Sequence, residues 1–194
     1  MIEQTFDFSS NKRDKGMKTL KVLGFSITAL AASVGSNAVV AEELDFSPGF
    51  YVVATAGNTE IDYGSGSKLG GNGYSIGAGY DFNEYLAVEA EFNNYFDFQV
   101  GSLNYTITGT SVRGLVRYPL GAWAPFVGYT YASAKETLVV DGTTYSGAGS
   151  LSGVSVGLEV ALTDTLALRV ISDNLETSGV TTGTTSKIGI VSRF

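Results

Sequence analysis

The 194-residue sequence contains no cysteine and no histidine. Without cysteine, the chain has no disulfides, no thiolate metal site, no cysteine nucleophile and no lipid-modified N-terminal cysteine. Without histidine, it lacks the usual general base, triads of the Ser-His-Asp type and most zinc chemistry. We therefore expect no enzyme activity, no catalytic residues, no cofactor and no metal site.

Proline and long apolar runs are also scarce. The chain has only 3 prolines, and no apolar run after residue 41 approaches the roughly 20 residues of a membrane-spanning helix. Glycine is abundant, at 25 residues, and aromatic residues make up 12% of the chain. This composition favours many close-packed strands over a disordered chain or a helical membrane protein.

The N-terminal region has the features of an extension followed by a signal peptide. Residues 1–16 are polar, and two lysines and an apolar run from Val22 to Val34 follow Met17. The run has the length of a signal-peptide core and is too short to cross a bilayer comfortably. Small residues allow cleavage after Ala38 or Ala41, and we prefer Ala41. Translation from Met17 and an uncleaved N-terminal anchor are the alternatives.

Cleavage after residue 41 divides the chain into a leader, 1–41, and a mature domain, 42–194. The mature domain carries seven basic and 16 acidic side chains, a formal charge of −9. An acidic domain of this kind is a poor partner for nucleic acid.

The stretch from Gly73 to Tyr95 shows the period of two that is typical of strands. One face carries apolar and aromatic residues, whereas the other is rich in glycine and charged residues. This pattern favours a closed barrel with lipid outside and a packed polar lumen. The alternative is a soluble β-sandwich, whose polar face would meet water.

The same alternation continues along the chain and predicts eight strands. Besides the hairpin in 73–95, they cover 50–57, 105–118, 123–135, 150–162, 166–173 and 187–194. Short turns near 83, 120 and 163 alternate with long polar connections at 58–72, 97–103, 136–149 and 174–185. Asp141-Gly142, within the third long connection, is a candidate hairpin turn of its own.

Strict alternation of short and long connections places all the short turns at one end. Transmembrane barrels have short periplasmic turns and longer extracellular loops, and an even strand number lets the last strand close on the first. The sequence therefore predicts an all-β fold, an eight-stranded antiparallel transmembrane β-barrel with up-and-down meander topology, preceded by a signal peptide.

Charged side chains on the predicted inner face define the candidate site. Measured from the short turns, most of them share a depth of roughly 10 to 13 Å. We expect these residues to form a luminal salt-bridge layer that plugs the barrel: Glu89, Glu91, Arg113, Arg117, Glu159 and Arg169. Arg193 is expected at the rim. The alternatives are a general acid/base pair of carboxylates and a gate in which Arg169 exchanges between Glu89 and Glu159.

These residues resemble the transmembrane domain of the OmpA-like (outer membrane protein A) family of small Gram-negative barrels. The resemblance covers residues 49–194 and rests on GYDFNEYLAVEAEF, the YPLG turn and GLEVALTDTLALR. It implies that Glu89, Glu159 and Arg169 belong to a luminal network that limits conduction. The family's fourth member, a lysine, is replaced here by Leu115. The peptidoglycan-binding domain of larger members is not present in the sequence.

The C-terminus resembles the signal that the barrel-assembly machinery recognises in such proteins. Phe194 is the last residue, and Ile190 and Ile188 share its face, although Ser192 stands where a large apolar residue is usual.

Three functions fit these features. The first is a non-enzymatic integral protein of the outer membrane, exported through the periplasm, that contributes to membrane integrity or surface interaction with a charge-plugged lumen. The second is a narrow porin-like channel for ions or small solutes, and the third a lipid-modifying barrel enzyme. The expected partners are the lipid bilayer, the barrel-assembly machinery and an extracellular ligand at the loops, and the barrel is expected to be a monomer.

Overall fold

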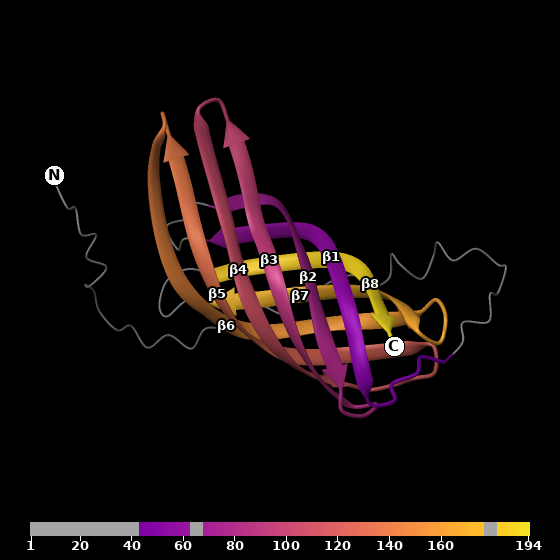
Figure 1. Ribbon diagram of the computed structural model, residues 1–194. Helices are drawn as coiled ribbons and strands as arrows, with labels where there is room; N and C mark the ends of the chain where they lie inside the picture. Colours follow the sequence, from indigo (N-terminus) through magenta and orange to yellow (C-terminus); the bar gives the residue numbers. More distant parts are fainter. Residues whose placement is uncertain (1–42, 63–67, 177–181) are drawn as a thin grey trace. The chain divides into compact units, whose positions relative to one another are not determined.

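The computed structural model describes residues 43–62, 68–176 and 182–194, so the predicted leader lies outside the described residues. Each strand pairs antiparallel with the next, and β8 pairs with β1 to close a barrel (Figure 1). This confirms the predicted eight-stranded, all-β meander. In the described part of the chain, no helix is long and apolar enough to cross a membrane. The strands are β1 Gly49–Asp62, β2 Lys68–Asp81, β3 Leu86–Val100, β4 Leu103–Arg117, β5 Trp123–Val140, β6 Thr143–Ala161, β7 Leu166–Glu176 and β8 Thr182–Arg193.

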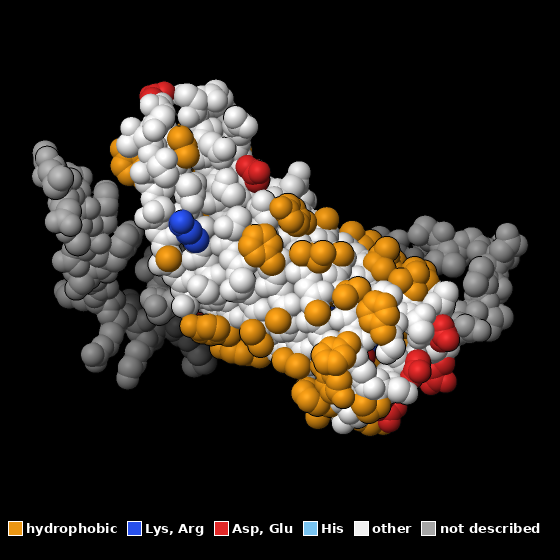
Figure 2. Space-filling view, viewed as in Figure 1, with side chains coloured by type: hydrophobic (Ala, Val, Ile, Leu, Met, Phe, Trp, Pro, Cys, Tyr) orange, Lys and Arg blue, Asp and Glu red, His pale blue; other side chains and the backbone are white. Residues whose placement is uncertain are grey.

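The barrel is apolar outside and polar inside. On the outer face, Phe50, Ile76 and Tyr129 are each exposed by more than half of their surface, whereas Arg169 and Glu159 are completely buried in the lumen. Figure 2 shows the resulting cover of hydrophobic side chains on one side of the barrel. A soluble sandwich would bury the apolar face, so this distribution favours the membrane barrel over the alternative.

Three short turns join strands at one end of the barrel, which we call the short-turn end. The side chain of Asn83 accepts hydrogen bonds from the amides of Tyr85 and Leu86, and Thr163 accepts one from Leu166 in the equivalent turn between β6 and β7. Such local bonds to short polar side chains specify tight turns. In the third turn, Gly121 adopts a φ of 68°, which a residue with a Cβ rarely adopts.

The strands extend further at the opposite end than the sequence predicted. Two of the four predicted long connections, 97–103 and 136–149, are paired strand except for the two-residue turns 101–102 and 141–142. The predicted hairpin turn at Asp141-Gly142 is confirmed, since both residues have positive φ, as a type I′ turn requires. The prediction of long loops was wrong there because residues 97–100 pair with β4, and the Gly-, Ser- and Thr-rich residues 143–149 pair with β5.

Strands β3 to β6 continue past the rest of the barrel and form a four-stranded sheet, which we call the overhang sheet. Within the described ranges, the last pair of β2 with β3 is Tyr74 and Asn94, and the last pair of β6 with β7 is Ser152 and Glu176. Pairing from β3 through β6 continues to the turns at 101–102 and 141–142. Figure 1 shows these two hairpins reaching beyond the other strands. We call this end the overhang end.

Aromatic rings and two apolar clusters fill part of the lumen. Tyr51 and Phe126 lie across Gly79 and Gly157, and a Cβ added to either glycine would collide with the ring. This explains why the inner face carries glycine there. One cluster lies toward the short-turn end and includes Leu115, and the other lies toward the overhang end and includes Phe96.

Candidate functional site

All six charged residues assigned to the luminal layer project from the inner face and are at least 95% buried. They come from β3, β4, β6 and β7. Their ion pairs also involve four further charged residues that the sequence-based assignment did not include: Asp81, Asp173, Lys187 and Arg193. We call these ten residues the charge network.

Arg169 holds two carboxylates from different strands. It lies directly opposite Glu159 in the register of β6 and β7, and its Nη2 is 2.5 Å from Glu159 Oε1. Its Nη1 is 2.5 Å from Glu89 Oε1, which also accepts a hydrogen bond of 2.8 Å from the Tyr51 hydroxyl. Arg169 therefore binds Glu89 and Glu159 at the same time.

Arg113 forms a second centre of the charge network. Its Nη1 lies 3.0 Å from Glu89 and 2.5 Å from Glu91, and its Nη2 lies 3.0 Å from Asp173. Its Nε donates to the hydroxyls of Thr130 at 2.9 Å and Ser155 at 3.1 Å. All of its donor groups thus face acceptors, which is what a buried guanidinium requires.

Lys187 closes a ring with Arg113. Its Nζ lies 3.4 Å from Asp173 and 3.9 Å from Glu91, and both of these carboxylates also bind Arg113. Two cations and two anions therefore alternate around the lumen at this level.

Arg193 was expected at the rim, and this expectation was wrong. Its side chain is buried and lies 3.0 Å from Asp81 and 2.6 Å from Glu159. Asp81 also binds Arg117 at 2.7 Å. The alternation alone places Asp81 and Arg193 on the inner face. They were left out because the predicted layer was defined by backbone depth, whereas a long guanidinium side chain reaches groups at another depth.

The ten residues form one continuous series of contacts. From the short-turn end it runs from Arg117 through Asp81, Arg193, Glu159, Arg169 and Glu89 to Arg113, and then to Glu91, Asp173 and Lys187. Five carboxylates face five cations, so the network is neutral although the sequence as a whole has a formal net charge of −7. Each carboxylate contacts at least one arginine.

A segment before β1 covers the charge network at the short-turn end. Leu44 and Phe46 are buried, and the backbone amide of Asp45 donates to the carbonyl of Asp164 in the turn before β7. The guanidinium groups of Arg117 and Arg193 lie 4.6 and 4.4 Å from the centre of the Phe46 ring. These are cation–π distances.

Asp45 helps to hold this segment in shape. The Ser47 hydroxyl, together with the Ser47 backbone amide at 2.8 Å, stabilises the carboxylate and holds the pKa of Asp45 below its ordinary value.

The three C-terminal residues singled out in the sequence lie on the outer surface. Phe194 is 81% exposed, and its amide donates to the carbonyl of Phe50 at 3.1 Å. Ile190 and Ile188 are about half exposed, as expected for side chains that face lipid. Their role as an assembly signal stays a prediction.

Among the described residues, no group of three or more Asp, Glu, Cys or His side chains is arranged to hold a metal ion.

Three comparisons relate the chain to known proteins. A search of curated proteins finds no match. Among solved structures, the chain is similar to Neisserial surface protein A, with 17% identity, a TM-score of 0.66, and coverage of 75% of this chain and 97% of that one.

Two further structures have the same fold. Ail, the attachment invasion locus protein of Yersinia pestis, shares 12% identity with a TM-score of 0.59 over 76% of this chain and all of that one. Ail has also been solved in complex with the heparin analogue sucrose octasulfate. The N-terminal β-barrel domain of Pseudomonas aeruginosa OprF shares 12% identity with a TM-score of 0.55, at the same coverage.

These low identities establish a shared fold, and the family comparison goes further. The model of the outer membrane protein beta-barrel domain matches residues 26–194, which is most of the sequence. The chain therefore belongs to the outer membrane protein β-barrel domain family.

Proposed function

We propose that this outer-membrane barrel is a non-enzymatic protein with a sealed lumen that contributes to membrane integrity and presents the overhang sheet for surface interaction. The observation that carries the proposal is the charge network, in which ten buried groups of balanced charge are linked without interruption. A continuous network of this kind fills the lumen with fixed side chains instead of water.

The contacts of Arg169 support a static plug over a gate. A gate that works by exchange would have Arg169 bound to either Glu89 or Glu159, and it is bound to both. Releasing it from either carboxylate would break a buried ion pair, and the carboxylate would keep only its other cation, Arg113 for Glu89 or Arg193 for Glu159. Thermal motion therefore populates such an open state rarely.

Phe46 adds a second barrier below the network. In barrels of this class, short turns face the periplasm. Under this proposal, Leu44 and Phe46 close the periplasmic end, and the overhang sheet faces the cell exterior.

The absence of enzyme activity rests on the same contacts. The sequence has no histidine or cysteine to act as base or nucleophile. Each of the five luminal carboxylates is bound by at least one arginine, so none is free to act on a substrate.

The overhang sheet is the element best suited to surface interaction. Among the residues that the structure describes, the edge of β6 from Thr143 to Leu151 pairs with β5 alone, and β3 beyond Tyr95 pairs with β4 alone. Free edges of this kind offer backbone groups to an added strand.

The net negative charge at the overhang end limits the class of surface partner. Of the described residues at the overhang end, six are acidic and two basic: Glu60, Asp62, Asp97, Glu136, Asp141 and Glu176 against Lys68 and Lys135. A polyanion such as the heparin analogue bound by Ail would be repelled here. We therefore propose a neutral or basic surface partner.

Single-channel recording in planar bilayers tests the sealed lumen. The refolded chain is compared with Arg169→Met and Glu159→Gln, which weaken the charge network, and with Lys68→Met, a matched loss of a cation at the exposed end. Migration on a gel with and without boiling first verifies that each variant forms a closed barrel.

We expect no discrete conductance from the unmodified chain or from Lys68→Met. Discrete steps from the unmodified chain that change in size with Arg169→Met would instead identify a narrow channel and overturn the sealed lumen. Assembly through Phe194 and a monomeric state stay predictions.

A further inference from the structure

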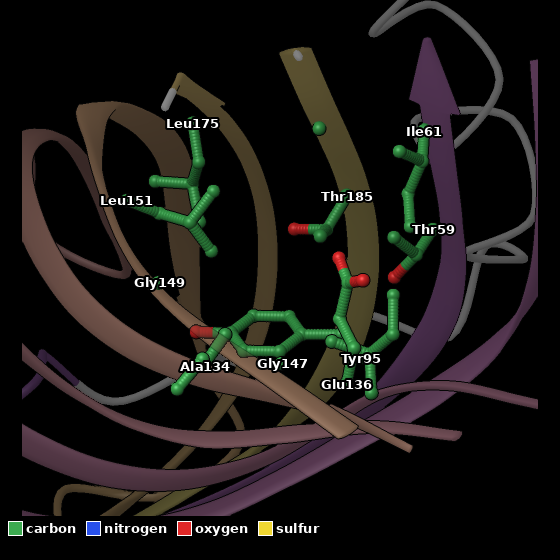
Figure 3. A pocket seen from close by; sticks show the side chains of 13 residues that line it. Thr59, Ile61, Tyr95, Ala134, Glu136, Gly147, Gly149, Leu151, Leu175 and Thr185 are labelled. Atoms are coloured by element: carbon green, nitrogen blue, oxygen red, sulfur yellow. The ribbon is translucent and has the colours of Figure 1, made fainter. Parts of the chain in front are cut away.

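A cavity of about 210 Å³ lies inside the barrel toward the overhang end. Seven of the eight strands line it, all except β2. Figure 3 shows Tyr95, Leu151, Leu175 and Ile61 around the space, with the Glu136 side chain also reaching into it. The charge network lies deeper in the lumen, because the cavity-lining Thr185 donates a hydrogen bond of 2.9 Å to Asp173.

Small residues create this space. Gly147 and Gly149 lie on the inner face of β6, and a Cβ added to either would have nothing within 4 Å. Further along the same face, a Cβ on Gly153 would collide with the backbone of Asn174. The glycines near the overhang end are therefore not needed for close packing, and they leave a void where larger side chains would fit.

The walls select for an apolar group of limited size. Ile61, Ile107, Leu151, Leu175 and the ring of Tyr95 supply aliphatic and aromatic surface. A protein cavity of about 150 Å³ with such walls can accommodate benzene. At about 210 Å³ the space suits a slightly larger ring or a short alkyl chain.

One charged residue faces this apolar space. Glu136 is exposed and makes no ion pair with any described residue. The neighbouring Lys135 is on the opposite face of β5, since successive residues of a strand alternate in direction. The acidic excess at the overhang end has the same sign, so a cation is favoured and an anion is repelled.

We propose that this cavity is a binding site for a small apolar amine, with the hydrocarbon group between the walls and the protonated amine at Glu136. This site is independent of the sealed lumen, because none of the residues that line the cavity belongs to the charge network, and its walls are the same whether or not ions pass through the network. It adds a ligand class to the surface role proposed above.

Isothermal titration of the full chain in zwitterionic phosphatidylcholine vesicles tests the proposal. The probes are butylamine, hexylamine and octylamine, compared with hexanol and hexanoate, and empty vesicles provide the correction for partition into lipid. Affinity should rise about fourfold for each added methylene group until the cavity is full, and then level off. Hexylamine should bind more tightly than hexanol, and hexanoate most weakly.

Two substitutions locate the binding. Gly149→Leu places a side chain in the open space and should weaken hexylamine binding at least tenfold. The matched control is Gly114→Leu, because Gly114 is on the lipid-facing side of β4 and also has nothing near its added Cβ. Glu136→Gln should weaken hexylamine binding by about threefold and leave hexanol binding unchanged.

The proposal is overturned if affinity keeps rising with chain length at the rate found for empty vesicles, because that is partition into the bilayer. It is also overturned if Gly149→Leu and Gly114→Leu bind hexylamine equally well. Should Gly149→Leu fail to show the folded band on an unboiled gel, Gly147→Leu replaces it. The chain-length series of amines on the unmodified protein tests the proposal without any substitution.

Discussion

The half of the lumen near the short turns holds ten charged side chains in mutual contact, whereas the half near the overhang sheet holds a cavity with mostly apolar walls. Both halves lie within one barrel with the same kind of lipid-facing surface. A charged filling must be complete, because a buried charge without a partner is very costly. An apolar filling can leave a void at the cost of lost packing contacts alone. Truncating a side chain should therefore change the free energy of unfolding by different amounts in the two halves.

The largest effect is expected from Arg169→Met. This change leaves Glu89 and Glu159 with fewer partners and should lower the free energy of unfolding by about 3 to 5 kcal/mol. Urea unfolding in vesicles measures the loss. The control, Lys68→Met, breaks the exposed pair with Glu60 at 2.6 Å and should cost less than about 1 kcal/mol. Equal losses of unfolding free energy from Arg169→Met and Lys68→Met would contradict the expectation that buried ion pairs stabilise the fold more than exposed ones.

Arg193→Met should be almost as costly, at about 3 kcal/mol, because Asp81 and Glu159 both lose a cation. The position expected from sequence, at a solvated rim, would instead predict a loss below about 1 kcal/mol. The same urea unfolding experiment distinguishes a member of the charge network from a rim residue.

Phe46→Ala should lower the free energy of unfolding by about 2 kcal/mol, since it removes an apolar cover and two cation–π contacts. The change should also let water reach Arg117 and Arg193, which hydrogen exchange of the short-turn end would detect. Leu69→Ala, at the overhang end, serves as control for exchange. No change in exchange near Arg193 after Phe46→Ala would mean that the segment does not seal this end.

The smallest expected effect is a difference in stability loss between truncations of two buried leucines. Leu115→Ala, in the short-turn half, should cost about 3 kcal/mol, and Leu175→Ala, beside the cavity, about 1 kcal/mol less. The difference arises because Leu175 already borders empty space and has fewer contacts to lose. Losses in the reverse order, again from unfolding in urea, would contradict a difference in packing between the two halves.

Much of the fold could be predicted from local patterns. The period of two identified all eight strands, and the inner or outer face of each assigned residue followed from it. The family resemblance drew attention to Glu89, Glu159 and Arg169, and in the structure Arg169 contacts both carboxylates. Strand ends were predicted less well, because Gly, Ser and Thr are common both in loops and in strands whose two faces meet water.

The membership of the charge network could be predicted only in part. Asp81, Asp173, Lys187 and Arg193 are on the inner face by alternation, but their pairing depends on strand stagger around the closed barrel. Arg193 and Asp81 are 112 residues apart and meet because β8 and β2 both neighbour β1. Sequence spacing within one hairpin contains no information about such a contact.

The sequence by itself determined the strand number, the inside-out polarity and the absence of histidine and cysteine chemistry, because these depend on composition and on a period within single segments. Tertiary structure decided which charges pair, that Phe46 lies under two arginines, and that glycines of β6 border a cavity. Each of these depends on distances between segments far apart in the chain, and closure of the barrel is what sets those distances.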